Sequence, residues 1–444
     1  MKKQALNRVF PMSTIVGFFL LAMCTGFGAG AAAPAGDSDT LLAHYRHLHR
    51  NPELSLQERN TSVYLVEQLE ATGFDVVTGI GGHGLVATLR NGDGPVILFR
   101  ADMDALPVEE QTGLPFSSTA RADNQAGEDV PVMHACGHDI HMTVLLGIAR
   151  EMAADRAGWH GTLLLIAQPA EEIGAGARAM LDDGLYERFP VPDYNLAFHV
   201  SPDLPAGSVG YVSGYALANV DSVDIMIYGV GGHGAYPQQT KDPIVIAART
   251  VLALQTLVSR ELPPLESAVV TVGSIHGGTK HNIIPDAVKL QLTVRSYSDE
   301  TRDFLLRRIG EISRGIAQSA GLPDERLPRV TVKDEYTPAV YNDPDLVSRV
   351  VQVLEATLGE TAVTAVDPVM AGEDFARYGR TEAHIPGALL WLGAVNPMQY
   401  QAARQRGEAL PGLHSARFAP DAEPTITTGL RAMHALLLEL FRGR

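Results

Sequence analysis

Apolar, strand-like segments that alternate with helical segments constrain the fold of this 444-residue chain more than any other feature. Residues 162–167 are apolar almost throughout, and 85–90, 96–100 and 195–200 also have strand character. Helical patterns separate these strands. Apolar strands that alternate with helices are typical of a mainly parallel sheet covered by helices on both faces. The sequence therefore predicts an α/β fold.

The order of the predicted elements changes near residue 215. Strand 222–230, helix 243–261, strands 268–275 and 288–296, helix 300–320 and strand 329–335 follow one another. This β-α-β-β-α-β order is that of a ferredoxin-like α+β sandwich. We therefore expect a catalytic α/β domain over 36–214 and 336–444, with a smaller domain inserted at 215–335.

The N-terminus has the pattern of a targeting segment. Two lysines and one arginine within the first eight residues precede the apolar run 14–24, and alanines then supply a cleavage-type sequence. This pattern predicts a cleaved signal peptide over 1–35 and a periplasmic or secreted protein. An uncleaved anchor and lipidation at Cys24 are the alternatives, and only these would place the protein on a membrane. From the sequence, we expect no apolar run of membrane-spanning length in the rest of the chain.

Composition excludes several classes of protein. The formal net charge is −16, so the surface should repel a phosphate backbone and nucleic-acid binding is not expected. Only two cysteines are present, which excludes a disulfide scaffold. After removal of residues 1–35, Cys136 would be the only cysteine left, either an inert buried thiol or a metal ligand.

Residues with metal-binding side chains follow the ends of the apolar strands. They are Asp102 and Asp104, the segment His134-Ala-Cys136-Gly-His138-Asp139-Ile-His141, the pair Glu171-Glu172, His199, and His414 in a later loop. Each alone has an ordinary structural explanation, such as a hydrogen-bonded histidine or a solvated carboxylate. However, the carboxyl ends of parallel strands share one edge of a sheet, where distant residues can converge. Thiolate, imidazole and carboxylate ligands together suit zinc or a related divalent metal.

Seven segments, in order, carry a family resemblance. They are His49-Arg-Asn-Pro-Glu53-Leu, Arg100-Ala-Asp-Met-Asp104-Ala-Leu-Pro107, His134-Ala-Cys-Gly-His138-Asp139, Gln168-Pro-Ala-Glu171-Glu172, Gly231-Gly-His233-Gly-Ala, His281-Asn282-Ile-Ile-Pro285-Asp and Ala371-Gly-Glu-Asp374-Phe. From about residue 40 onward the chain resembles the M20 metallopeptidase family, in particular its amidohydrolase branch of hippurate hydrolases and auxin–amino-acid conjugate hydrolases. The inserted domain agrees with the lid, or dimerisation, domain of that family.

The resemblance implies a centre with two divalent metal ions, zinc or manganese, with cobalt or nickel as further candidates. The implied ligands are Cys136, His138, Glu172, His199 and His414. Glu171 matches the general base, and Asp104 matches an acid that orients a ligand. The wider family has a histidine at the position of Asp102 and a bridging aspartate at that of Cys136, which leaves the metal's identity open.

The resemblance also implies a function and roles for the inserted domain. His233 is similar to the histidine that stabilises the oxyanion, in some relatives from a partner subunit, so a homodimer through this domain is expected. Asn282 and Arg295 match positions that contact substrate, and a guanidinium suits a product carboxylate. The implied reaction hydrolyses small N-acyl or N-aroyl amino acids of the hippurate type to a carboxylic acid and an amino acid.

Two alternative functions stay open. One is deacetylation of N-acetyl amino acids or N-acetyldiaminopimelate, with the same site and a smaller acyl pocket. The other, from a different class, is a non-catalytic exported metal-binding protein. Glu171 argues against the latter, because a structural metal site needs no spare base.

Overall fold

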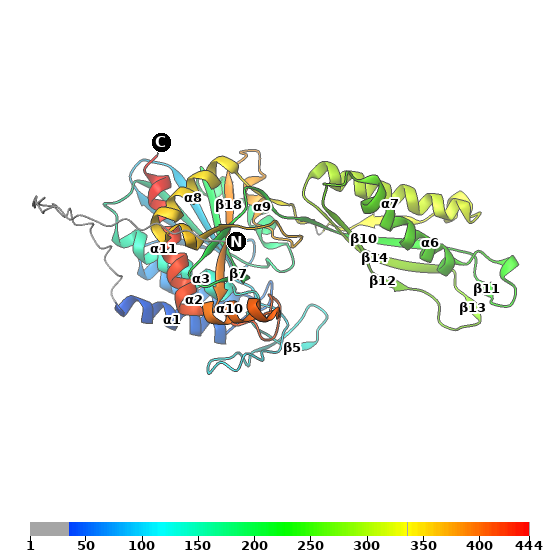
Figure 1. Ribbon diagram of the computed structural model, residues 1–444, viewed down its shortest axis with the longest axis horizontal. Coiled ribbons are helices and arrows are strands. Elements are labelled where there is room, and N and C mark those ends of the chain that lie inside the picture. Colours follow the sequence, from blue (N-terminus) through cyan, green and yellow to red (C-terminus); the bar gives the residue numbers. More distant parts are fainter. Residues whose placement is uncertain (1–34, 335, 444) are drawn as a thin grey trace, which may run out of the picture.

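The computed structural model describes residues 35–334 and 336–443. The predicted signal peptide lies, except for its last residue, outside these residues. The described chain forms a larger α/β body and a smaller body, which we call the lid body and define as residues 219–332 (Figure 1). The two are joined by extended segments that include the paired strands β9 (Gly214–Leu217) and β16 (Val340–Asn342).

The α/β body is built on an eight-stranded sheet of mixed, mainly parallel strands, which confirms the predicted fold class. The sheet order is β1 (Asp75–Ile80), β2 (Gly84–Asn91), β6 (Gly161–Gln168), β3 (Val96–Asp102), β7 (Tyr194–Pro205), β18 (Gly387–Val395), β8 (Val209–Tyr211) and β17 (Val363–Ala365). The four central strands are parallel to one another. Antiparallel pairing is found toward the edges, where β2 pairs with β1 and β6, and β18 pairs with β8.

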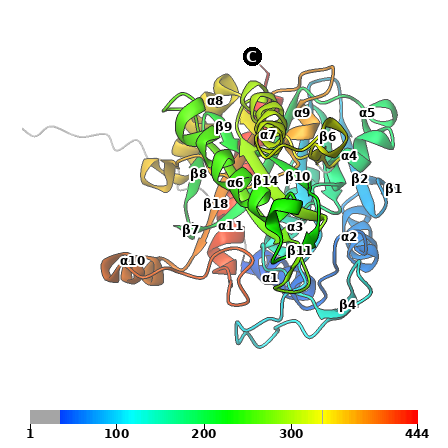
Figure 2. The same cartoon turned by 90° about the vertical axis from the view of Figure 1, so that its right-hand side faces the viewer.

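Helices cover both faces of this sheet. One face packs against α1 (Ala35–Arg50), α2 (Arg59–Ala71), α3 (His138–Ala154), α8 (Pro344–Leu358) and α11 (Ala422–Phe441). The other packs against α4 (Gly176–Asp182), α5 (Leu185–Arg188) and α9 (Ala376–Gly379). Successive residues of a strand point to opposite faces, so Leu163 and Leu165 join the first core while Leu164 and Ile166 join the second. Helix α10 (Pro397–Arg406) stands away from the rest of the body (Figure 2).

The lid body has the element order that the sequence predicts. Its antiparallel sheet has the order β12 (Ala268–His276), β14 (Ala287–Ser296), β10 (Asn219–Tyr228) and β15 (Arg329–Val332). Its two long helices, α6 (Pro243–Thr256) and α7 (Asp299–Ser319), share one core with the sheet. The exact limits of a domain at 215–335 stay a prediction.

One helical stretch differs from the expectation that no apolar run of membrane-spanning length follows the N-terminal segment. Together α6 and the π-turn that follows it (Leu257–Glu261) are long and apolar enough to cross a membrane, by length and composition alone. Ile246, Ala247 and Leu254 of α6 are buried in the core of the lid body, whereas Leu252 is exposed.

The sequence predicts a helix from about His141 to Ala154 and a strand over 195–200, and both boundaries near the candidate site were wrong. Helix α3 begins at His138 because Gly137 takes a left-handed conformation (φ +77°) that turns the chain into the helix. A Cβ there would meet the Cγ2 of Val200 at 2.6 Å, so glycine is required. Strand β7 does not end at residue 200 but continues to Pro205.

Candidate metal centre

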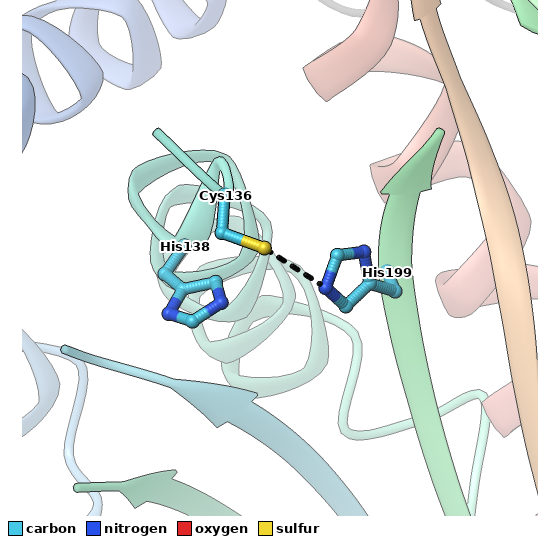
Figure 3. Close-up of side chains that lie close together, drawn as sticks. All are labelled: Cys136, His138 and His199. Carbon is cyan, nitrogen blue, oxygen red and sulfur yellow. Dashed lines mark hydrogen bonds between the residues drawn. The ribbon is translucent and has the colours of Figure 1, made fainter. Parts of the chain in front are cut away.

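The predicted ligand residues converge at one edge of the central sheet. Strands β3 and β6 are parallel, with Asp102 opposite Gln168, so residues that follow either strand emerge at the same edge. Glu171 and Glu172 come directly after β6, while Cys136 and His138 lie at the start of α3. His199 reaches the same place from β7, and Figure 3 shows it beside Cys136 and His138 at the start of α3.

The ligand atoms fall into two groups of three that share one thiol. Cys136, His138 and His199 form the first group, and Cys136, Glu172 and His414 form the second, with the ligand atoms of each group within 4.8 Å of one another. Figure 3 shows the Sγ of Cys136 pointing at the Nε2 of His199, at 3.5 Å. His414 Nε2 lies 3.3 Å from an Oε2 of Glu172. Each group offers a thiol sulfur with imidazole or carboxylate atoms, and these residues could hold a divalent cation.

Hydrogen bonds to backbone carbonyls fix the Nδ1 atoms of both buried histidines and leave each Nε2 available to a ligand. The Nδ1 of His138 donates to the backbone carbonyl of Asp104 at 2.8 Å, and the Nδ1 of His199 to that of Val200 at 2.9 Å. A neutral imidazole with its proton on Nδ1 presents a lone pair at Nε2. Among the described residues, neither His138 Nε2 nor Glu172 Oε1 has a hydrogen-bond partner, although both atoms are buried. Because buried polar atoms are normally satisfied, these residues fit a bound metal.

The electrostatics of this edge favour a cation. Burial and the charges of Glu373 and Glu172 raise the pKa of Glu171 well above its ordinary value. Burial also raises the pKa of Glu172 to about 7, and burial with both glutamates raises that of the Cys136 thiol. Burial alone would lower the pKa of His138, but the charge of Asp102 and the neighbouring acids raise it to about 10. Divalent cations would relieve this concentration of negative charge and hold the thiol as a thiolate.

Asp104 makes hydrogen bonds to residues of the candidate site, and its orienting role stays a prediction. One of its carboxylate oxygens accepts from the Ser55 hydroxyl at 2.6 Å and from the Glu172 amide at 3.0 Å. Its backbone carbonyl fixes the tautomer of His138. These hydrogen bonds reach a residue of each ligand group.

Asp102 is already engaged by two other side chains. Its carboxylate accepts hydrogen bonds from Arg100 and from the Nδ1 of His141, each at 2.6 Å. The Nε2 of His141 accepts a hydrogen bond from the Val200 amide at 2.9 Å. Both nitrogens of His141 are therefore used. Although His141 lies within reach of His138, these bonds assign Asp102 and His141 to support of the centre.

A buried ionic network that was not predicted from the sequence lies behind Glu171. Arg100 is fully buried and donates to Asp102, Glu373 and Asp374. An arginine that follows four apolar residues of strand β3 was the available signal. Its partners at 373–374 belong to a motif that the resemblance identified without a role. This network ties the C-terminal half of the α/β body to the carboxylates around the centre.

The structure does not bring the three lid residues to this edge. His233 lies on β11 (Gly232–His233), which pairs with β13 (Ile283–Ile284) beside Asn282. Figure 1 places this strand pair at the end of the lid body that points away from the α/β body. Arg295 lies near the other end of β14 and donates to the Met370 carbonyl at 2.5 Å. Within one chain, His233 and Asn282 are thus separated from both the centre and Arg295.

Comparison with known proteins agrees with this geometry. Residues 98–411 match the family described as peptidase family M20/M25/M40. The chain belongs to this family. It is 36% identical over 395 residues to the N-acetyldiaminopimelate deacetylase of Leuconostoc mesenteroides, a match that covers 86% of this chain and 97% of the relative. It is also 36% identical over 357 residues to the N-acetyl-L-cysteine deacetylase of Bacillus subtilis, with 80% of each chain covered.

A solved M20 structure shares the whole fold. The Bacillus subtilis YXEP protein, described as a dinuclear metal-binding peptidase of the M20 family, superposes with a TM-score of 0.74. The two are 29% identical, and the match covers 93% of this chain and all of the other. Membership of the family makes this M20 chain a metal-dependent hydrolase of linear amides, as predicted. The alternative of a non-catalytic metal-binding protein is therefore not supported.

Proposed function

We propose that this M20 enzyme removes the acetyl group from N-acetylated amino acids, with N-acetyldiaminopimelate and N-acetylcysteine as the substrate class. The observation that carries the proposal is 36% identity to two deacetylases, one for each of these compounds, over 97% of the first relative and 80% of the second. This observation supports the alternative expected from the sequence better than a hippurate-like substrate. Acetate and a free amino acid are the products.

The roles of the residues follow from their positions. Divalent cations held by Cys136, His138, Glu172, His199 and His414 would polarise the amide carbonyl and lower the pKa of the attacking water. Glu171 borders this group, with Oε2 3.9 Å from the Nε2 of His138, and is placed to accept the proton of that water. The same carboxyl then returns the proton to the departing amine. Glu172 would coordinate a metal and take no part in this proton transfer.

The lid histidine has the polarity that an oxyanion needs. The Nδ1 of His233 accepts a hydrogen bond from the Ala235 amide at 3.0 Å. The neutral ring therefore carries its proton on Nε2. An exposed N–H can stabilise the negative oxygen of the tetrahedral intermediate. Because His233 lies at the far end of the lid body, we propose that it serves the centre of a second copy of the chain. Arg295, at the other end of the sheet, remains a candidate for binding the substrate carboxylate.

A substrate panel tests the proposed function. Hydrolysis of N-acetyldiaminopimelate, N-acetylcysteine and hippurate would be followed by amine release, with native enzyme, chelator-treated enzyme and enzyme reloaded with zinc or manganese. We expect the acetylated compounds to have the larger kcat/KM, activity to vanish with chelator, and metal to restore it. Faster hydrolysis of hippurate would overturn the acetyl specificity, whereas activity that survives complete metal removal would overturn the mechanism.

A further inference from the structure

A buried ion-pair cluster lies next to the first ligand group. The imidazole of His49, on α1, is 2.7 Å from an Oδ2 of Asp139 through Nδ1 and 3.1 Å from an Oε1 of Glu110 through Nε2. The side chains of His49 and Glu110 are at most 1% exposed. Asp139 directly follows the ligand His138 in the first turn of α3. One end of the cluster is therefore fixed to the metal-binding helix.

The other end of the cluster holds the loop 110–118. The Oε2 of Glu110 accepts a hydrogen bond from the Ser118 amide at 2.6 Å. The Oε1 of Glu110, which faces His49, also accepts a hydrogen bond from the Thr112 hydroxyl. Beside Glu110, the backbone amide of Gln111 donates to the Ala416 carbonyl at 2.7 Å. Ala416 lies two residues after His414, so this bond connects the cluster to the loop that carries the last ligand.

His414 depends on such external support. It is a non-glycine residue in the left-handed region, with φ +64°, a conformation that persists when the surrounding structure enforces it. Its side chain is 55% exposed, whereas that of Glu172 is 7% exposed and the other three ligands are buried. Its amide donates to the Ala135 carbonyl at 2.9 Å, and the Gln111–Ala416 bond holds the loop just beyond it. Because the side chain of His414 is half exposed, these two backbone hydrogen bonds hold its loop in place.

We propose that the His49–Glu110 ion pair positions His414 and thereby sets the affinity of the second metal, the one held by Cys136, Glu172 and His414. This inference rests on the proposed two-metal centre. His49 and Glu110 are positioning residues that act through the loop 110–118. The first metal, held by Cys136, His138 and His199, keeps its buried ligands when the pair is broken. Partners outside the ligand set commonly change metal affinity by about 10- to 100-fold.

The test titrates zinc into the metal-free full-length protein with a competing chelator, which yields a dissociation constant for each step. His414→Ala identifies the second step by abolishing it. Glu110→Gln, which keeps shape but removes the charge, should weaken that step by about 10- to 100-fold and leave the first unchanged. His49→Gln should do the same and serves as an independent variant if Glu110→Gln does not fold.

A matched control separates positioning from general stabilisation. Asp221→Asn removes the buried carboxylate of an ion pair in the lid body, where Asp221 and Arg302 lie 2.7 Å apart, and should lower Tm without moving either zinc constant. Two unchanged constants in both Glu110→Gln and His49→Gln would overturn the positioning role alone, as would equal weakening of both steps. Failure of the unmodified protein to bind two zinc ions would overturn the proposed centre as well.

Discussion

The metal-binding edge and the tip of the lid body place functional residues in opposite ways. At the edge, Cys136, His138 and His199 are buried and hydrogen bonds fix both histidine rings. At the tip, His233 and Asn282 are exposed on a two-residue strand pairing. Ligands must be held within a fraction of an ångström, so a rigid sheet edge suits them. Groups that close over a bound substrate can be delivered from outside, by lid movement or a second chain.

The largest expected effect tests the division of labour within the rigid edge. Glu171→Gln removes the proton acceptor but no proposed ligand, so turnover should fall by roughly 10² to 10⁴-fold while metal content stays near native. Glu172→Gln should instead lose metal, because a neutral amide is a poorer ligand for a divalent cation. Turnover and elemental analysis on both variants provide the comparison. Metal loss in Glu171→Gln with retention in Glu172→Gln would reverse the two roles.

The next effect tests whether the tip serves another chain. His233→Ala should lower kcat by roughly 10² to 10³-fold, the usual effect of losing an oxyanion donor, with metal content unchanged. When this variant is mixed with Glu171→Gln and subunits exchange, about one quarter of the sites in a random population of dimers would hold both residues if His233 acts across the dimer. Activity should then reappear. If mixing restores nothing although subunits have exchanged, His233 acts within its own chain.

The shared thiol offers a sharper probe of the edge itself. Cys136→Ser should weaken zinc binding by at least about tenfold, since an alcohol is a harder and less acidic ligand than a thiol, and activity should fall in parallel. Both zinc steps should move, because both ligand groups contain Cys136. Zinc titration of the variant makes the measurement, and full native affinity would remove Cys136 from the centre.

A smaller effect concerns the pH dependence of stability at the edge. Burial alone would lower the pKa of His49, but hydrogen bonds to Asp139 and Glu110 raise it from 6.5 to about 9. A folded pKa above the unfolded one stabilises the protein fully below pH 6.5, and this stabilisation is lost as pH rises through 9. It amounts to about 3 kcal/mol. Urea unfolding at pH 6.5 and 9.5 should show a smaller pH dependence in His49→Gln, and an identical dependence would contradict the assigned ion pair.

The sequence predicted the strands of the metal-binding edge better than the buried ion pairs behind them. The apolar strands 96–100, 162–167 and 195–200 correspond to β3, β6 and β7, and parallel pairing was enough to infer that distant ligands meet. The ion pairs behind them were not predictable, since Arg100 and Glu373 are 273 residues apart and pattern gives no pairing information over that distance. Strand β1, with Gly79 inside it, lacks a clear alternation of apolar residues and was missed.

The position of the lid residues shows a different limit. The motifs around His233 and Asn282 were recognised, and the element order of the lid body was correct, yet neither tells where the body lies relative to the sheet. That position depends on the joining segments, where β9 pairs with β16 and the Val369 amide donates to the Ala216 carbonyl. Both are short, irregular contacts without a sequence pattern.

The most direct test of the account is element-specific anomalous diffraction from crystals loaded with zinc. The account predicts two peaks, one beside Cys136, His138 and His199 and one beside Cys136, Glu172 and His414, with the sulfur of Cys136 next to both. A single peak, or a metal bound through Asp102 and His141 instead, would contradict the two-metal centre.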